Sequence, residues 1–123
     1  MPKTVLIADH NPLVRKVLCR ILEVEERYDI CLEAANGAEA VFLATKWKPD
    51  IIILDFPMRV MNGLEAAREL KVIMPNVPII LFSQHGALLR QNADLNRDVD
   101  RIVPKGDAAA LIKHVRELVP PIN

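Results

Sequence analysis

The sequence predicts an α/β fold in which a parallel β-sheet carries helices on both faces. Short apolar runs alternate with amphipathic helical patterns along the 123 residues, which is typical of repeated β-α-β units with right-handed crossovers. The run from Ile51 to Leu54 contains four consecutive aliphatic residues, as expected for a strand buried on both faces. A carboxylate, Asp55, follows directly, at the edge of the sheet where open α/β folds bind ligands.

The remaining elements follow from the same patterns. Strands are expected at residues 4–8, 28–34, 51–54, 77–82 and 101–103. Helices are expected to begin at Pro12, after the break at Asn36-Gly37, at Gly63, at Gly86 and after the capping residue Asp107.

The expected core-facing residues of the helices recur at helical spacing. In chain order they are Leu13, Val14, Val17, Leu18, Ile21, Leu22; Ala38, Val41, Phe42, Ala44; Leu64, Ala67, Leu70, Lys71; and Leu111, Ile112, Val115, Leu118. The segment 86–98 has only a weak stripe, diluted by polar residues: Leu88, Leu89, Leu95 against Asn92, Asp94, Asn96, Asp98.

Composition narrows the range of functions. Sixteen basic and sixteen acidic residues cancel, so nothing indicates direct nucleic-acid binding or attraction to an anionic membrane. No apolar stretch approaches the roughly 20 residues of a membrane span, and the first three residues are not a secretory signal. The expected compartment is the cytoplasm. Cys19 and Cys31 lack CxxC spacing, so we expect reduced, buried thiols.

Polar residues stand at the carboxyl ends of four predicted strands. They are Asp9, Asp55, Ser83 and Lys105. A buried carboxylate needs compensating groups, and the parallel sheet brings these strand ends to one edge. We therefore expect the four residues to share a cleft.

The order of these residues resembles the receiver domain of two-component response regulators along the whole chain. The strongest part is the pattern Asp55-x-x-Met58-x-x-Met61-x-Gly63 after a strand preceded by Lys48-Pro49-Asp50. The resemblance implies a three-layer, flavodoxin-like fold with the parallel sheet order 2-1-3-4-5. It also implies that a histidine kinase or phosphotransfer protein passes a phosphoryl group to Asp55.

The residue types suit this chemistry, because an acyl phosphate concentrates negative charge that must be neutralised. The resemblance implies Mg²⁺, held by Asp9, Asp55 and the backbone carbonyl of Pro57. Lys105 would pair with the phosphoryl oxygens, and the hydroxyl of Ser83 would donate to another oxygen.

Four positions depart from the family pattern. His10 replaces the second acid, which normally contacts the metal, and imidazole is a poor Mg²⁺ ligand. We therefore expect weakened Mg²⁺ binding if His10 faces the cleft; an outward-facing ring is the open alternative. Arg59 and Gly106 stand where Pro is usual, and Pro104 precedes Lys105 instead. Ile102 replaces an aromatic ring whose movement normally reports phosphorylation.

Three other side chains need an interpretation. His85 follows Ser83 by two positions and is a candidate to overhang the pocket and affect the lifetime of an acyl phosphate. Trp47 is expected to be a partly exposed packing residue, and His114 a solvated surface residue.

The expected protein is a single receiver domain over residues 1–123, with no output domain in this chain. It is not an enzyme beyond self-phosphorylation and slow autodephosphorylation. It signals to a downstream protein that the sequence does not identify, and a homodimer is compatible with this role. The sequence leaves two possibilities open: the chain is a stand-alone protein, or it is part of a longer regulator.

Two alternatives remain. The first is a degenerate receiver that serves as a phosphorylation-independent docking module. The second, a hydrolase or nucleotide-binding enzyme, is less well supported, because GxGxxG and GxxxxGK[ST] motifs are absent from the sequence.

Overall fold

The computed structural model describes residues 2–91 and 97–120. Its five strands form one parallel sheet in the order β2-β1-β3-β4-β5, which confirms the order implied by the resemblance. The strands are β1 (Thr4–Ala8), β2 (Ile30–Ala34), β3 (Ile51–Leu54), β4 (Ile79–Ser83) and β5 (Arg101–Pro104).

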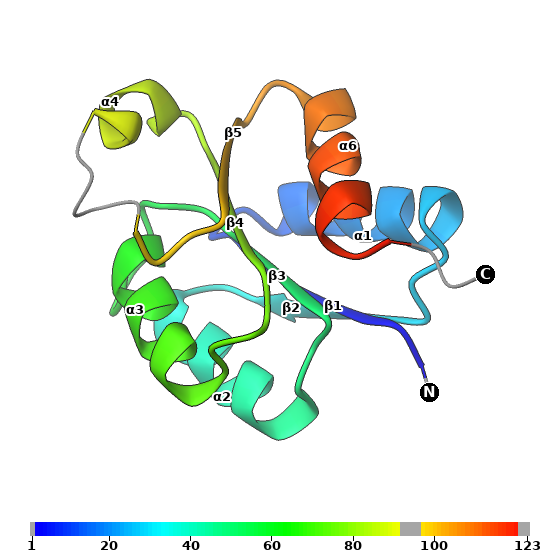
Figure 1. The fold of residues 1–123 in the computed structure, drawn as a ribbon, viewed down its shortest axis with the longest axis horizontal. Coiled ribbons are helices and arrows are strands. Elements are labelled where there is room, and N and C mark those ends of the chain that lie inside the picture. The colour runs from blue at the N-terminus through cyan, green and yellow to red at the C-terminus, as the bar shows by residue number, and fades with distance from the viewer. Residues whose placement is uncertain (1, 92–96, 121–123) are drawn as a thin grey trace.

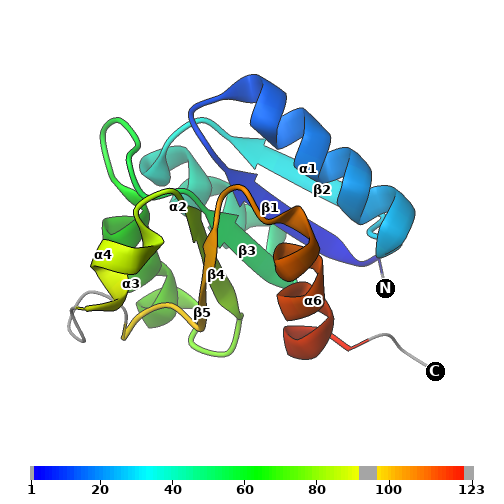
Figure 2. The same ribbon diagram turned by 90° about the horizontal axis from the view of Figure 1, so that it is seen from above.

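Helices cover both faces of the sheet, as Figures 1 and 2 show. On one face lie α1 (Pro12–Glu25) and α6 (Ala108–Leu118). On the other lie α2 (Gly37–Trp47), α3 (Gly63–Ile73) and the short α4 (Gly86–Arg90). Strand β3 serves both layers: Ile51 and Ile53 pack towards α1 and α6, whereas Ile52 and Leu54 pack towards α2 and α3. This two-sided burial explains the unbroken aliphatic run.

Two strand boundaries differ from the prediction. Strand β2 begins at Ile30 rather than at residue 28, because the backbone N–H of Tyr28 donates to the carbonyl of Leu22 at 3.2 Å. The backbone of Tyr28 therefore bonds to the last turn of α1 instead of pairing in the sheet. The side chain of Tyr28 is buried. Strand β4 begins at Ile79 because Pro78 has no N–H to offer a neighbouring strand.

The apolar residues predicted for α3 and α6 lie on their core sides, whereas Lys71 of α3 pairs with Asp100. The predicted stripe on α1 was partly wrong. Leu18, Cys19 and Leu22 are buried, whereas Leu13 is 68% exposed and Val17 49% exposed. The buried face of α1 is therefore rotated away from the predicted stripe. Among residues 2–91 and 97–120, none of the helices combines the length and the apolar character that a membrane span requires.

Helix α2 also departs from its predicted stripe. Ala40 and Ala44 are fully buried, while Phe42 is exposed. Small side chains face the core because α2 packs closely against α3 and the sheet. For the weakly patterned segment 86–98, the structure describes α4 up to Arg90. The predicted core side chains at positions 88 and 95 and the polar residues at 92–96 lie outside what it describes.

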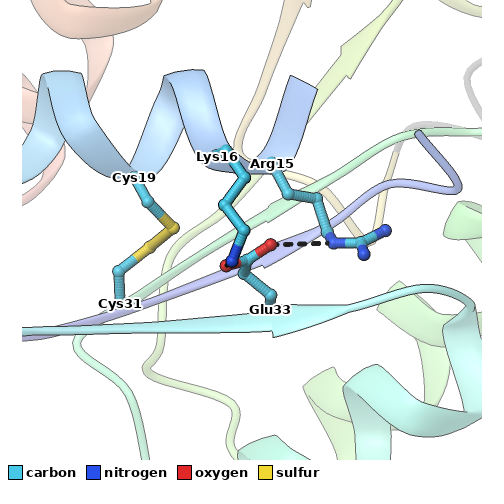
Figure 3. The surroundings of a disulfide bond; sticks show 5 residues. All are labelled: Arg15, Lys16, Cys19, Cys31 and Glu33. Carbon is cyan, nitrogen blue, oxygen red and sulfur yellow. Dashed lines mark hydrogen bonds and ion pairs between the residues drawn. A yellow bond between two sulfur atoms is a disulfide. The ribbon is translucent and has the colours of Figure 1, made fainter. Parts of the chain in front are cut away.

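Cys19 and Cys31 form a disulfide bond, which corrects the expectation of two separate reduced thiols. The bond joins α1 to β2, as Figure 3 shows, with Cα atoms 5.7 Å apart. The sequence carried no signal for this pairing, because the cysteines are 12 positions apart and only the fold brings helix and strand together.

A salt-bridge cluster beside the disulfide ties the same two elements together (Figure 3). The Glu33 carboxylate accepts from Arg15 Nε at 3.1 Å and from Lys16 Nζ at 2.9 Å. Partial burial opposes ionisation of Glu33, but the hydrogen bonds from Lys16 and Arg15 outweigh it and lower the pKa of Glu33. Arg15 also donates to the backbone carbonyl of Asp9, so this cluster reaches the carboxyl end of β1.

Candidate functional site

Two carboxylates meet at the carboxyl edge of the sheet. The backbone N–H of Asp55 donates to the carbonyl of Ala8 at 2.9 Å, and the N–H of Asp9 donates to the carbonyl of Ala34 at 3.0 Å. These bonds extend the pairing of β1 with its neighbours by one residue. Both side chains are nearly buried, with 2% of Asp9 and 3% of Asp55 exposed. Such a pair requires a nearby cation.

Lys105 supplies that cation from the end of β5. Its Nζ lies 2.6 Å from Oδ2 of Asp9 and 2.7 Å from Oδ2 of Asp55. Burial favours the neutral amine, but the hydrogen bonds and charges of Asp55 and Asp9 outweigh it and raise the pKa of Lys105. Lys105 is therefore a cation held between the two carboxylates.

The structure decides between the two open orientations of His10. Its side chain is 59% exposed, but Nδ1 lies 3.6 Å from Oδ1 of Asp9 and 3.8 Å from Oδ2 of Asp55. The three side chains form a group that could hold a metal ion, with one ligand atom from each within 4.8 Å of the others. His10 thus faces the cleft.

The loop that follows Asp55 is held close to the site by two glycines. The N–H of Gly63 donates to the carbonyl of Phe56 at 2.9 Å, and a Cβ at Gly63 would collide with the carbonyl oxygen of Asp55. Gly37 packs in the same way against the carbonyl of Met61. Only glycine fits these close backbone approaches, which explains why the sequence pattern ends in Gly63.

The loop ends at the start of α3, and it contains one residue with a strained backbone conformation. Asn62 and Glu65 form a capping box at the beginning of α3. Val60 has a φ of 68° and is 85% exposed. A β-branched residue rarely adopts this left-handed conformation. The sequence comparison with the family pattern did not single out Val60.

A cleft of about 360 Å³ opens over Asp55, whereas Asp9 is not part of its lining. Its lining contains His10, Asp55 and Lys105, together with Pro57 from the loop after β3 and His85 from the loop after β4. His85 therefore lies over the pocket, as its position in the sequence suggested. A larger cavity of about 580 Å³ lies at the opposite edge of the sheet, near Lys3 and Asp50, and contains none of the predicted site residues.

Ser83 is at the end of β4 as predicted, but it is fully buried and is not part of the cleft lining. Its Oγ accepts a hydrogen bond from the N–H of His85 at 3.2 Å. The structure thus brings Asp9, Asp55 and Lys105 together directly, while Ser83 is buried next to the cleft-lining residue His85. The hydroxyl keeps its O–H donor and a second acceptor lone pair.

Of the other departures, Ile102 is the most informative. Its side chain is half-buried and packs against the apolar cluster that includes α4. The guanidinium of Arg90 in α4 donates to the Ile102 carbonyl. Arg59 is exposed beside the cleft, and Gly106 lies in an exposed turn closed by the bond from Asp107 N to the carbonyl of Pro104 at 3.0 Å.

Comparison with known proteins agrees with this geometry. The sequence model of the response regulator receiver domain matches residues 5–116. The transcriptional regulatory protein PdtaR of Mycobacterium tuberculosis is 39% identical over an alignment covering 100% of this chain and 56% of that protein. A protein-glutamate methylesterase/protein-glutamine glutaminase of Hahella chejuensis is 39% identical over 68% of this chain and 21% of its own length. The chain thus spans about half or less of these relatives.

Solved structures show the same fold. The response regulator TrrA from Thermotoga maritima, in complex with Mg²⁺ and BeF, has a TM-score of 0.86 and 30% identity, over 95% of this chain and 99% of that one. The response regulator domain of Thermotoga maritima CheB has a TM-score of 0.80 at 22% identity, covering 100% of both chains. The chain belongs to the response regulator receiver domain family, whose members are typically phosphorylated on an aspartate and bind Mg²⁺ through acidic residues.

Proposed function

We propose that this chain accepts a phosphoryl group on Asp55 from the phosphohistidine of a histidine kinase or phosphotransfer protein. The observation that carries the proposal is the position of Oδ2 of Asp55. It belongs to a buried carboxylate that lines the cleft, and it lies 2.7 Å from the ammonium of Lys105. A nucleophilic oxygen beside a fixed cation is what phosphoryl transfer to a carboxylate requires.

In the proposed transfer, an oxygen of Asp55 forms a bond to phosphorus while the phosphorus–nitrogen bond of the donor breaks. The donor nitrogen keeps the electron pair of that bond. The product is an acyl phosphate, whose added negative charge Lys105 is placed to neutralise. The buried hydroxyl of Ser83 is proposed to donate to a phosphoryl oxygen, which requires the loop after β4 to move towards Asp55.

Some of the possible metal-ligand atoms at this site suit Mg²⁺. The carboxylates of Asp9 and Asp55 supply the oxygen ligands that Mg²⁺ prefers, and we propose the carbonyl of Pro57 as a third. When bound, the ion would neutralise charge on the transferring group. We propose that Mg²⁺ binds more weakly than in ordinary receivers, because the neutral imidazole of His10 replaces a carboxylate in the charge balance.

His85 is proposed to affect the lifetime of the phosphorylated state. Its ring lines the cleft and meets the ring of Phe56 edge-on, with centroids 6.1 Å apart. A side chain in this position can place or exclude the water that would hydrolyse the acyl phosphate.

We propose that residues 1–123 act as one receiver domain in the cytoplasm and signal by protein–protein contacts. No catalytic role beyond self-phosphorylation and slow autodephosphorylation is assigned to them. The near-zero net charge supports recognition of proteins rather than nucleic acid or membrane.

The deciding experiment is incubation with acetyl phosphate, with and without Mg²⁺, followed by intact-mass measurement. We expect one added phosphoryl group on the wild type and none on Asp55→Asn. Asp29→Asn, which changes an exposed carboxylate outside the cleft, is the matched control and should be labelled like the wild type. Equal labelling of Asp55→Asn would contradict the assignment. A wild type that is never labelled would favour the phosphorylation-independent docking module.

A further inference from the structure

The donor atoms around Asp55 include a nitrogen, and this affects which metal the site selects. We infer that the site prefers a divalent transition ion, such as Mn²⁺, Co²⁺ or Zn²⁺, over Mg²⁺, and that Nδ1 of His10 sets this preference. The inference rests on the proposed function, because the metal would lie on the carboxylates that take part in phosphoryl transfer.

The geometry places all three side chains within reach of one ion. Nδ1 of His10 lies 3.6 Å from Oδ1 of Asp9 and 3.8 Å from Oδ2 of Asp55. Ligands of a single ion with metal–ligand distances of about 2.1 Å stand about 3–3.5 Å apart. A small rotation of the His10 ring would bring Nδ1 to that separation from both oxygens, and the three ligand atoms lie within 4.8 Å of one another. Because that side chain is 59% exposed, the rotation disturbs no core packing.

The charges around the site favour the same conclusion. Asp9 and Asp55 contribute two negative charges and Lys105 one positive charge, so the site has a formal charge of −1 with neutral His10. A neutral imidazole adds no further Coulomb attraction for a hard ion such as Mg²⁺. It does add a nitrogen donor, which raises affinity for borderline transition ions.

The ion would not have to displace Lys105 from Asp9. Lys105 contacts Oδ2 of Asp9, whereas His10 faces Oδ1 of the same carboxylate. One carboxylate can therefore serve the ammonium and a metal at the same time. Cys19 and Cys31 are joined to each other, so they offer no thiolates that would compete for a transition ion.

Calorimetric titration with Mg²⁺, Mn²⁺, Co²⁺ and Zn²⁺ tests the preference, in buffer without thiol reductant. The proteins compared are the wild type, His10→Asp, His10→Ala and the control His114→Ala, whose ring lies on α6 outside the cleft. We expect the ratio of the Mg²⁺ to the Co²⁺ dissociation constant to fall by about tenfold or more in both His10 variants. It should stay unchanged in His114→Ala.

A second readout identifies the ligand atom. With Zn²⁺, the ¹⁵N resonance of His10 Nδ1 should shift on binding, whereas that of His114 should not. Equal metal ratios in the wild type and His10→Ala, an unmoved His10 resonance, or a wild type that binds none of the four ions would each overturn the inference.

Failure of this inference and failure of the proposed function give different results. Normal labelling of Asp55 with equal metal ratios would remove the metal preference alone. An intact preference without labelling by acetyl phosphate under any of the four ions would remove the phosphoacceptor function alone.

Discussion

The Cγ2 atom of Ile102 lies 3.0 Å from the point where a Cβ atom on Gly86 would stand. The side chain at the start of β5 thus packs directly under the first residue of α4, against the apolar cluster on that face of the sheet. The side chain of Ile102 has no polar atoms, so exposing it to water would be unfavourable. We therefore expect Ile102 to remain packed against α4 in both states of the domain.

This packing leads to a prediction about how phosphorylation spreads. A ligand shifts an equilibrium only through its different interaction with the two states. With beryllofluoride and Mg²⁺ as phosphoryl mimic, we expect large NMR shift changes around Ser83 and His85 and small ones on the exposed side of Ile102. Asp55→Asn is the control and should show none beyond those that Mg²⁺ alone causes. Equally large changes at Ile102 would show that β5 transmits the signal without an aromatic ring.

Replacing Val60 by glycine is expected to stabilise the domain, because of the backbone conformation at this position. Its φ of 68° costs an L-residue about 1–2 kcal/mol, whereas glycine loses roughly 0.5–1 kcal/mol through greater freedom of the unfolded chain. Val60→Gly should therefore raise the free energy of unfolding by up to about 1 kcal/mol in denaturant titrations.

Val72→Gly is the matched control for this substitution. Val72 is also exposed, at 81%, but it lies inside α3. There the same change should lower the free energy of unfolding by about 0.2–0.5 kcal/mol, because glycine is a poorer helix former than valine. Loss of stability in both variants would show that Val60 is not strained.

The disulfide between Cys19 and Cys31 should make the stability of the domain sensitive to reductant. The bond closes a loop across a sequence separation of 12, and a link of this size stabilises a fold by about 3 kcal/mol in the chain-entropy description. We expect denaturant midpoints to fall when a thiol reductant is added. The double variant Cys19→Ala/Cys31→Ala should not respond to reductant. A wild type with two alkylatable thiols before reduction would contradict the bond itself.

The lowered pKa of Glu33 predicts the sign of one pH effect. A carboxylate with a depressed folded-state pKa contributes stability that is fully present above its unfolded value of about 4.3. This contribution is lost as the pH falls through the folded-state pKa. Glu33→Gln should therefore lower the free energy of unfolding at pH 7, with a difference from wild type that shrinks below pH of about 4. Glu23→Gln, at an exposed position, is the comparison variant. The same pH dependence of unfolding free energy in both variants would contradict the prediction.

The sequence pattern predicted the parallel sheet and the meeting of Asp9, Asp55 and Lys105, because both follow from local signals and from the geometry of parallel strands. The aliphatic run of β3 required burial on both faces, and a carboxylate at its end required a cation, which β5 provides through Lys105. These arguments used local composition and the geometry of parallel strands alone.

Features that depend on contacts between distant segments could not be obtained in this way. The pairing of Cys19 with Cys31 and the buried face of α1 are set by how α1 packs on the sheet. The direction of His10 depends on the loop between β1 and α1. Apolar residues on several sides of α1 made the sequence stripe ambiguous. The burial of Ser83 beneath the cleft similarly depends on the loop that follows β4.

The end of the sheet at β5 bears on how this domain can associate with other proteins. Exposed sheet edges invite a further strand from another chain. Here the carbonyl of Ile102 already accepts a hydrogen bond from Arg90, and Pro104 has no N–H group that could donate one. An incoming strand would find few free backbone groups along this border. Association by adding a strand next to β5 is therefore disfavoured.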